Sequence, residues 1–457
     1  MNREYIYIEA TSSFCNECMK LVPSKIVAQE GKIYILKYCP DHGETCALLE
    51  DEAEYHMKKR HYDKPSTSME TQTAVKNGCP YDCGICPMHD QHACIGLIEI
   101  TTCCDLQCPT CYADAGKGEF LDLAKISAMM DLFMESEGQK GEILQISGGE
   151  PSLHPQILEI IQLAQDKKIQ HVMLNTNGLR IATDLPFVQE LSKFKGGFEV
   201  YLQFDGFKKS TYEKLRGKDL LTIKKQALSN LMDAQIPVTL VMTVDKGVND
   251  DEVGEVFTYA LSNPYIRGVN YQPVAYFGRI DDAEVDVNNR STLTSIVYSF
   301  KEQTGGMLTH DDFVPLPCDV ERVAITYLSK TRKGGFLPIT RNLEVKKYLH
   351  LINNTFAFTI EQMLDNAKEG KKDIKSFTSC CDLMTDFRKI VPIDFLAKSK
   401  EKKMEYIDFN TFRVSVSSFV DRYNFDLKSM QKECVHVITE DLKKIPFSAY
   451  NMIYRED

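Results

Sequence analysis

The chain has 457 residues, enough for two or three domains, and its 43% of hydrophobic residues suffice for a sizeable core. It lacks both a run of 18 uncharged apolar residues and the apolar start of a signal peptide, so we expect a cytoplasmic protein without a transmembrane segment. The formal charge of -11 disfavours nucleic acid as a partner, because such binding needs a basic surface. Most of the 16 cysteines fall in short groups, which indicates metal binding rather than disulfides.

The first candidate site lies in the N-terminal part, residues 1–62. Two groups, Cys15-Asn-Glu-Cys18 and Cys39-Pro-Asp-His42, flank a strand-turn-strand pattern around Gly31. Two knuckles on a hairpin can bring four ligands into a tetrahedron. We expect a closed, structural site for one zinc or mononuclear iron, with Cys15, Cys18, Cys39 and His42 as ligands. Cys46 competes with His42 for the fourth position, and His42 could instead only cap the turn.

A second group of cysteines lies in residues 63–96. The charged and polar stretch from Asp51 to Lys76 predicts a helix followed by a linker, and we place the first domain boundary there. After it come Cys79, Cys83 and Cys86, spaced Cys-x3-Cys-x2-Cys, and either Cys94 or Cys103 could supply a fourth ligand.

The same spacing recurs at Cys104, Cys108 and Cys111, between a predicted strand at 98–101 and a predicted helix at 121–137. Three cysteines on one short loop can hold three corners of a [4Fe-4S] cluster and leave the fourth iron without a protein ligand. A zinc site or buried free thiols are the alternatives. An iron without a protein ligand would have a free coordination position at which a reactant could bind.

From His154 to Arg279 the pattern alternates between helices and strands. Helices are predicted at 154–167, 187–194 and 223–234, and strands at 143–146, 171–178, 198–206, 238–243 and 269–275. This alternation implies parallel strands with right-handed crossovers, and ligands then bind at the carboxyl ends of the strands.

The triad, the following Tyr112 and Ser147-Gly-Gly-Glu-Pro151 resemble, in order and spacing, the radical SAM superfamily, over about residues 94–279. In that superfamily the open iron holds S-adenosylmethionine and the cluster cleaves it reductively to a 5'-deoxyadenosyl radical. The whole chain looks like the group containing archaeal tetraether lipid synthase and the 7,8-dihydro-6-hydroxymethylpterin dimethyltransferases, which carry extra iron-sulfur clusters. The resemblance assigns S-adenosylmethionine to Cys104, Cys108 and Cys111, and an auxiliary cluster to Cys79, Cys83 and Cys86 with Cys94.

Polar residues at the predicted strand ends are the candidates for binding S-adenosylmethionine. Gly148 and Gly149 permit close approach to the main chain, and the resemblance places the amino group of S-adenosylmethionine there with Glu150 nearby. Arg216 is a candidate partner for its carboxylate, because a guanidinium pairs with a carboxylate through two hydrogen bonds. The remaining candidates are Asn175, Thr176, Asn177, Gln203 and Asp205. The alternative for all of these polar residues is ordinary turn and cap chemistry.

Beyond the barrel, predicted at 97–280, residues 281–457 are expected to form an α-rich, cluster-binding extension, with helices at 292–303 and 360–367. Four late cysteines could form a further cluster, as the resemblance implies, or be buried thiols: Cys318, Cys380, Cys381 and Cys434. Adjacent Cys380 and Cys381 point in different directions in an extended chain, which makes joint ligation awkward. Ser448 stands where the related sequences carry a cysteine, which puts a full ligand set in doubt.

The sequence therefore predicts an α/β protein, a partial (β/α)6 radical SAM barrel between a small N-terminal metal-binding domain and the extension. The resemblance implies an enzyme with one or two auxiliary [4Fe-4S] clusters and reduced ferredoxin or flavodoxin as electron donor. It would functionalise an unactivated C–H bond and form a C–C bond, either methylating a pterin-like small molecule or coupling lipid alkyl chains. The acidic charge favours a small, diffusible substrate. The alternative is an iron-sulfur electron-transfer or redox-sensing protein without radical chemistry.

Overall fold

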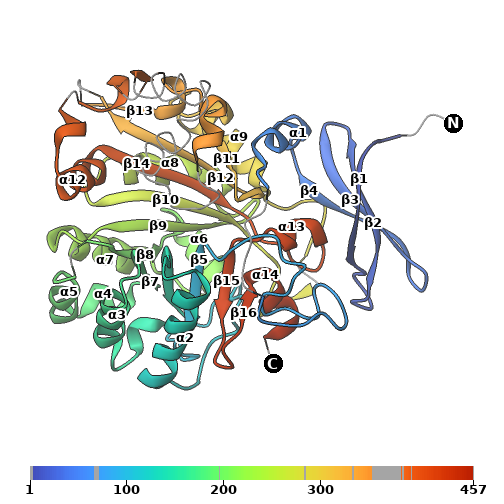
Figure 1. The fold of residues 1–457 in the computed structure, drawn as a ribbon, viewed down its shortest axis with the longest axis horizontal. Coiled ribbons are helices and arrows are strands. Elements are labelled where there is room, and N and C mark those ends of the chain that lie inside the picture. Colours follow the sequence, from blue (N-terminus) through green and yellow to red (C-terminus); the bar gives the residue numbers. More distant parts are fainter. Residues whose placement is uncertain are drawn as a thin grey trace.

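The computed structural model describes residues 4–65, 71–194, 196–282, 285–331, 334–352, 382, 385–386, 388–392 and 394–455. Its N-terminal part is a four-stranded antiparallel sheet that lies at one side of the molecule (Figure 1). Alternate residues of these strands, such as Ile33 and Ile35, are buried, as expected of a sheet with one packed face. The strands are β1 (Ile6–Phe14), β2 (Leu21–Gln29), β3 (Lys32–Cys39) and β4 (Gly43–Glu50), and the short helix α1 (Ala53–Lys59) follows them.

Six parallel strands in sequence order form the centre of a second, larger sheet. They are β5 (Ile95–Glu99), β6 (Ile143–Ser147), β7 (His171–Thr176), β8 (Phe198–Gln203), β9 (Val238–Val244) and β10 (Ile266–Pro273). Because consecutive strands are parallel neighbours, all their carboxyl ends meet at one edge. The predicted fold class, a partial barrel behind a small N-terminal domain, is confirmed.

Helices connect these strands and cover the outer face of the sheet (Figure 1). In α3, Ile157, Ile160, Ile161 and Ala164 are buried, which is the spacing of one helix face. The connecting helices are α2 (Leu123–Ser136), α3 (Ile157–Asp166), α4 (Leu179–Thr183), α5 (Leu185–Leu191), α6 (Lys209–Arg216), α7 (Leu221–Asp233) and α8 (Val253–Leu261).

The C-terminal part differs from the α-rich extension that we expected. Its helices include α9 (Leu293–Gln303), α12 (Lys400–Asn410), α13 (Leu427–Gln431) and α14 (Phe447–Ala449), but its described residues also form strands of the large sheet. These are β11 (Val314–Leu316), β12 (Asp319–Lys330), β13 (Phe336–Pro338), β14 (Thr411–Ser417), β15 (Val435–Ile438) and β16 (Lys444–Pro446). The expected helix at 360–367 lies outside the described residues.

The late strands extend the barrel at both edges. Strand β14 pairs in parallel with β10, and β15 pairs in parallel with β5. The C-terminal segment therefore contributes to the barrel wall on both sides of the six central strands. Among the described residues, none of the helices has the length and apolar character needed to cross a membrane.

Candidate active site and metal centres

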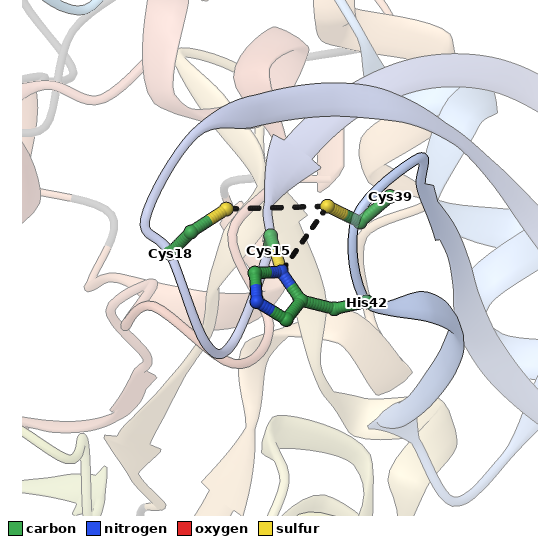
Figure 2. A group of neighbouring side chains, drawn as sticks. All are labelled: Cys15, Cys18, Cys39 and His42. Carbon is green, nitrogen blue, oxygen red and sulfur yellow. Dashed lines mark hydrogen bonds between the residues drawn. The ribbon is translucent and has the colours of Figure 1, made fainter.

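The N-terminal sheet brings one four-residue group together. The ligand atoms of Cys15, Cys18, Cys39 and His42 all lie within 4.8 Å of one another (Figure 2). Cys15 and Cys18 come from the turn between β1 and β2, whereas Cys39 ends β3 and His42 precedes β4. Burial raises the pKa of Cys15, but backbone N–H groups of Cys18 and Glu17 outweigh it and lower the pKa to about 6, which favours the thiolate that binds metal. Cys46, on β4, is not part of the group.

The loop that contains Cys104, Cys108 and Cys111 follows β5 and lies at the carboxyl ends of the strands. The backbone N–H of Leu106 donates to the sulfur of Cys104 at 3.4 Å, the kind of contact that a cluster thiolate accepts. Arg279 holds the loop from outside, because its guanidinium donates to the carbonyl oxygen of Cys108 at 3.1 Å. Three sulfurs on a backbone fixed in this way fit the three-cysteine set of a cluster.

The two glycines after β6 lie against the chain that leads into this loop. A Cβ on Gly148 would lie 2.3 Å from the carbonyl oxygen of Thr101, and one on Gly149 would lie 2.2 Å from that of Cys103. The N–H of Gly149 donates to Thr101 at 2.8 Å, and that of Glu150 donates to Cys103 at 2.7 Å. Glycine is therefore required here to seat the β6 loop on the cysteine loop, whether or not a ligand is also present.

Glu150 links the ends of β6 and β7. Its buried carboxylate accepts the hydroxyl of Thr176 at 2.7 Å and the N–H of Asn177 at 2.7 Å. The side chain of Asn177 in turn donates to Asp105 in the cysteine loop at 2.7 Å. Nearby, Asn175 has a buried amide oxygen without a hydrogen-bond partner, a polar atom still available to a ligand.

Arg216 lies elsewhere than we expected. Its guanidinium pairs with Asp205 through two hydrogen bonds of 2.8 Å and also donates to Thr243 at 2.9 Å. Asp205 is fully buried and also accepts the amide of Gln203. Arg216 is therefore a buried partner of Asp205, which takes one side-on pair of its donors, Nε and Nη2.

Lys224, on α7, is a site residue that the sequence did not indicate. Its ammonium group donates to the carbonyl oxygens of Asn177 and Gln203, and to the side-chain oxygen of Gln203. Burial lowers the pKa of Lys224 to about 7. Its only sequence signal is a lysine on the apolar face of a helix, a pattern that is normally tolerated through snorkelling.

The C-terminal end covers the cysteine loop. The ring of Tyr112 lies 5.3 Å from that of Phe447, and its hydroxyl lies 3.4 Å from Ser147 on β6. Arg455 pairs with Glu99 at the end of β5, with its closest N–O distance at 2.6 Å. Tyr112 is therefore placed between the cysteine loop and the C-terminal segment.

The loop with Cys79, Cys83 and Cys86 packs under the same C-terminal segment. The hydroxyl of Tyr454 accepts the N–H of Cys83 at 2.9 Å and donates to the carbonyl oxygen of Pro80 at 3.0 Å. A hydrogen bond with Cys79 and burial together raise the pKa of Cys83. The three cysteines are buried and adjacent on one loop, as a cluster site requires.

Cys94 belongs to a different group from the one we expected. Its sulfur and those of Cys318 and Cys434 lie within 4.8 Å of one another, and all three side chains are buried. Cys94 directly precedes β5, Cys434 directly precedes β15, and Cys318 directly precedes β12. Pairing of β15 with β5 brings residues 94 and 434 together, so this three-cysteine group lies at the amino-terminal end of the barrel.

Of the other late residues, Cys380 and Cys381 lie outside the described residues. Ser448 is buried, and its hydroxyl donates to the carboxylate of Glu433 at 3.1 Å and accepts the N–H of Val420 at 3.2 Å. Both contacts of Ser448 serve to hold the C-terminal segment against residues around Cys434.

A small cavity inside the barrel lies next to the three-cysteine group. Its free volume is about 50 Å³, room for roughly three or four water molecules. One wall is apolar and shares Ile95, Ile143 and Val323 with the packing around Cys94. The polar wall is formed by Gln145, Tyr201, Asn270, Gln272, Asp319, Arg413, Ser415, Ser417, Ser418 and Glu433.

The polar wall is a connected set of donors and acceptors. The amide nitrogen of Asn270 donates to the hydroxyl of Tyr201, and its amide oxygen accepts Ser415 at 2.8 Å and Ser417 at 3.0 Å. The amide of Gln272 also lies 3.5 Å from Tyr201. A larger groove of about 700 Å³ lies among α2, α3 and α5 on the outer layer, away from the cysteine groups.

Comparison with known families gives two matches. Residues 98–260 match the radical SAM superfamily, and residues 7–51 match the HMPTM N-terminal zinc ribbon domain. The first match covers β5 to α8 with the loop of Cys104, and the second covers the four-residue group of Figure 2.

Among individual proteins, the chain is similar to 7,8-dihydro-6-hydroxymethylpterin dimethyltransferase of Methanocaldococcus jannaschii, with 32% identity over 98% of this chain and 94% of that protein. It is also 26% identical to GTP 3',8-cyclase of Alkaliphilus oremlandii, over 39% of this chain and 56% of that protein. The crystal structure of Streptococcus suis SuiB aligns with a TM-score of 0.39 and 15% identity, over 48% of this chain and 49% of SuiB.

Proposed function

Because this chain belongs to the radical SAM superfamily, in the group that contains 7,8-dihydro-6-hydroxymethylpterin dimethyltransferase, we propose that it transfers methyl carbon to a pterin-like small molecule through radical chemistry. The observation that carries this proposal is the 32% identity to that enzyme over 98% of this chain, and the barrel interior adds connected amide and hydroxyl groups on one wall and apolar side chains on the other. A flat heterocycle needs both kinds of surface, one for its ring edges and one for its ring faces.

The chain's cysteines divide into four sets, each of which we assign one metal group. Cys104, Cys108 and Cys111 would hold the [4Fe-4S] cluster with the open iron. Auxiliary iron-sulfur centres would sit at Cys79, Cys83 and Cys86, and at Cys94, Cys318 and Cys434, and one zinc or iron ion would sit at Cys15, Cys18, Cys39 and His42. When bound, the first cluster and S-adenosylmethionine supply a carbon radical that removes hydrogen from an unactivated C–H bond.

The residues around the first cluster position the ligand and exclude water. Gly148 and Gly149 let the β6 loop lie directly against the cysteine loop, and the unpartnered oxygen of Asn175 is available to a ligand donor. Tyr112 and the C-terminal segment close the loop from the other side. The three cysteines are themselves half-exposed, so Tyr112 and the C-terminal segment shield one side of the loop from water.

The cavity lies beside the group of Cys94, Cys318 and Cys434, and none of its described lining residues comes from the loop of Cys104. The loop of Cys104 follows β5, whereas Cys94 precedes it, so the two are separated by a strand of five residues, about 16 Å of rise. An external one-electron donor such as ferredoxin or flavodoxin would supply the electron.

The lipid alternative is less favourable. Coupling of alkyl chains would require a long apolar tunnel, and the cavity is small and polar along one wall. Pure electron transfer would leave the open iron without a purpose.

The test is anaerobic incubation of the reconstituted protein with dithionite and S-adenosylmethionine. We expect 5'-deoxyadenosine from the wild type and none from C104A, and with 7,8-dihydro-6-hydroxymethylpterin we expect products heavier by one or two methyl groups. Formation of 5'-deoxyadenosine without methylated pterin, but with coupled alkyl chains when a lipid is supplied, would refute the pterin proposal. Absence of 5'-deoxyadenosine from protein with a full cluster would refute radical chemistry altogether.

A further inference from the structure

A tyrosine on the polar wall of the cavity has its hydrogen-bonding role set by its neighbours. Tyr201 is on β8 and lines the cavity. Its hydroxyl accepts a hydrogen bond from the side-chain amide of Asn270, on β10, and β9 lies between these two strands. Nothing in the sequence singled out Tyr201, because an aromatic residue in a strand is normally a packing residue.

Two serines set the orientation of the Asn270 amide. Strand β10 pairs with β14 in a register that places Asn270 opposite Ser415. The hydroxyl groups of Ser415 and Ser417 donate to the amide oxygen of Asn270 at 2.8 Å and 3.0 Å, and all three residues are buried. An amide carries its oxygen and its NH2 group on opposite sides, so with the oxygen held by the serines the NH2 group faces Tyr201.

Tyr201 is therefore left as a hydrogen-bond donor. Its oxygen accepts from Asn270, and the amide of Gln272 lies 3.5 Å away, beyond the usual 2.7–3.2 Å of an N–H···O bond. Within the part of the chain that the structure describes, no residue accepts the phenolic proton in return. Burial raises the pKa of Tyr201 to about 12, so the phenol keeps that proton at neutral pH.

We propose that Tyr201 donates a hydrogen bond to a ring carbonyl oxygen of a heterocyclic substrate, and that Asn270 keeps the phenol in this donor role. The inference rests on the proposed function, because it requires a heterocycle in the cavity. A carbonyl oxygen has two lone pairs and accepts over a broad range of directions. An alkyl chain has no acceptor and would leave the phenolic proton unpaired, so Tyr201 selects a heterocycle over a lipid.

The first measurement is equilibrium binding of 7,8-dihydro-6-hydroxymethylpterin to the reconstituted, unreduced protein, in which no turnover occurs. Y201F removes only the hydroxyl group and should bind this pterin about tenfold more weakly, or about 1.4 kcal/mol. Y271F is the matched control, because Tyr271 donates to the carbonyl oxygen of Val253 at 2.9 Å and does not line the cavity. Y271F should bind like the wild type. Equal binding by Y201F and the wild type would overturn the proposal.

The second measurement tests the role of Asn270. Asn270→Asp keeps the phenol but offers its proton an acceptor, because a carboxylate accepts and cannot donate. We expect N270D to weaken binding by a similar factor, and Y201F/N270D to bind no more weakly than Y201F alone. Wild-type affinity in N270D would show that Tyr201 already donates to Asn270, and additive losses would show that the two residues act independently. Either result contradicts the proposal.

The third measurement separates a hydrogen bond from a packing effect. The infrared band of a pterin labelled with 13C at its ring carbonyl should move to higher frequency when the ligand binds to Y201F instead of the wild type, and should not move in Y271F. An unmoved band in Y201F, with unchanged affinity, would refute only the role of Tyr201. Failure of the wild type to bind the pterin at all would refute the pterin assignment of the proposed function and this inference with it.

Discussion

The chain holds two groups of candidate metal ligands that are assembled in opposite ways. The zinc ribbon group takes its four residues from two turns of one small sheet, all within residues 15–42. The three-cysteine group takes its residues from positions 94, 318 and 434, which only the pairing of β15 with β5 and the position of β12 bring together. The first site closes a local unit, whereas the second lies where the first and late strands of the barrel meet.

This difference implies different consequences of metal loss. Ligands from two turns of one small sheet hold only that sheet, so the rest of the chain can remain folded without them. Ligands from three distant segments hold the late strands against the early ones, so the barrel wall and the cavity beside it depend on them. We therefore expect the long-range site to control substrate chemistry and the local site to control only the N-terminal sheet.

The largest effect should come from Cys434→Ala. Loss of this sulfur removes a buried ligand next to the cavity, and we expect methylated product to fall below detection while 5'-deoxyadenosine formation stays within about threefold of the wild type, a change under 1 kcal/mol in barrier. Quantifying both products in the same anaerobic reaction checks this. Equal loss of both would show that the two ends of the barrel are not separable, and unchanged product would show that the three-cysteine group has no part in the reaction.

A smaller effect is expected from Lys224→Met, at the carboxyl ends of the barrel strands. The ammonium group holds the carbonyl oxygens of Asn177 and Gln203, so its removal loosens two strand ends beside the cysteine loop. Loss of one or two net hydrogen bonds predicts S-adenosylmethionine binding weaker by about tenfold, or about 1.4 kcal/mol. Equilibrium binding to the reconstituted protein measures this, with the exposed Lys225→Met as control.

The same variant tests the charge state of Lys224. Burial lowers its pKa from 10.5 to about 7, so the folded protein releases this proton above pH 7 while the unfolded chain keeps it to about pH 10.5. The unfolded chain then binds more protons between these values, and the contribution of Lys224 to the free energy of unfolding rises with pH across that window. The difference in unfolding free energy between the wild type and K224M should show this slope, and a flat difference would contradict it.

Local signals in the sequence predicted the local features well. The cysteine spacing within residues 15–42 predicted the zinc ribbon group, and the apolar spacing of α3 predicted a helix where one is found. Cys318 and Cys434 were predicted to share a site, but that Cys94 joins them was not predictable, because no periodicity relates Cys94 to Cys434 and only strand pairing does. The pairing of Arg216 with Asp205 was missed for the same reason, since a guanidinium selects the nearest buried carboxylate in space and not a ligand inferred from a motif.

The smallest effect on 5'-deoxyadenosine formation should come from Cys39→Ala. Cys39 belongs to the local site, so its loss should remove one metal ion per chain and unfold the N-terminal sheet, while 5'-deoxyadenosine formation changes by less than about twofold. Cys46→Ala is the matched control, because Cys46 lies on the neighbouring β4 outside the group and its loss should leave the metal in place.

Metal analysis and activity on the same samples decide the outcome. If C46A loses the metal, Cys46 and not His42 completes the site. If C39A abolishes 5'-deoxyadenosine formation, the small sheet supports the barrel directly, and the separation between local and long-range sites does not hold.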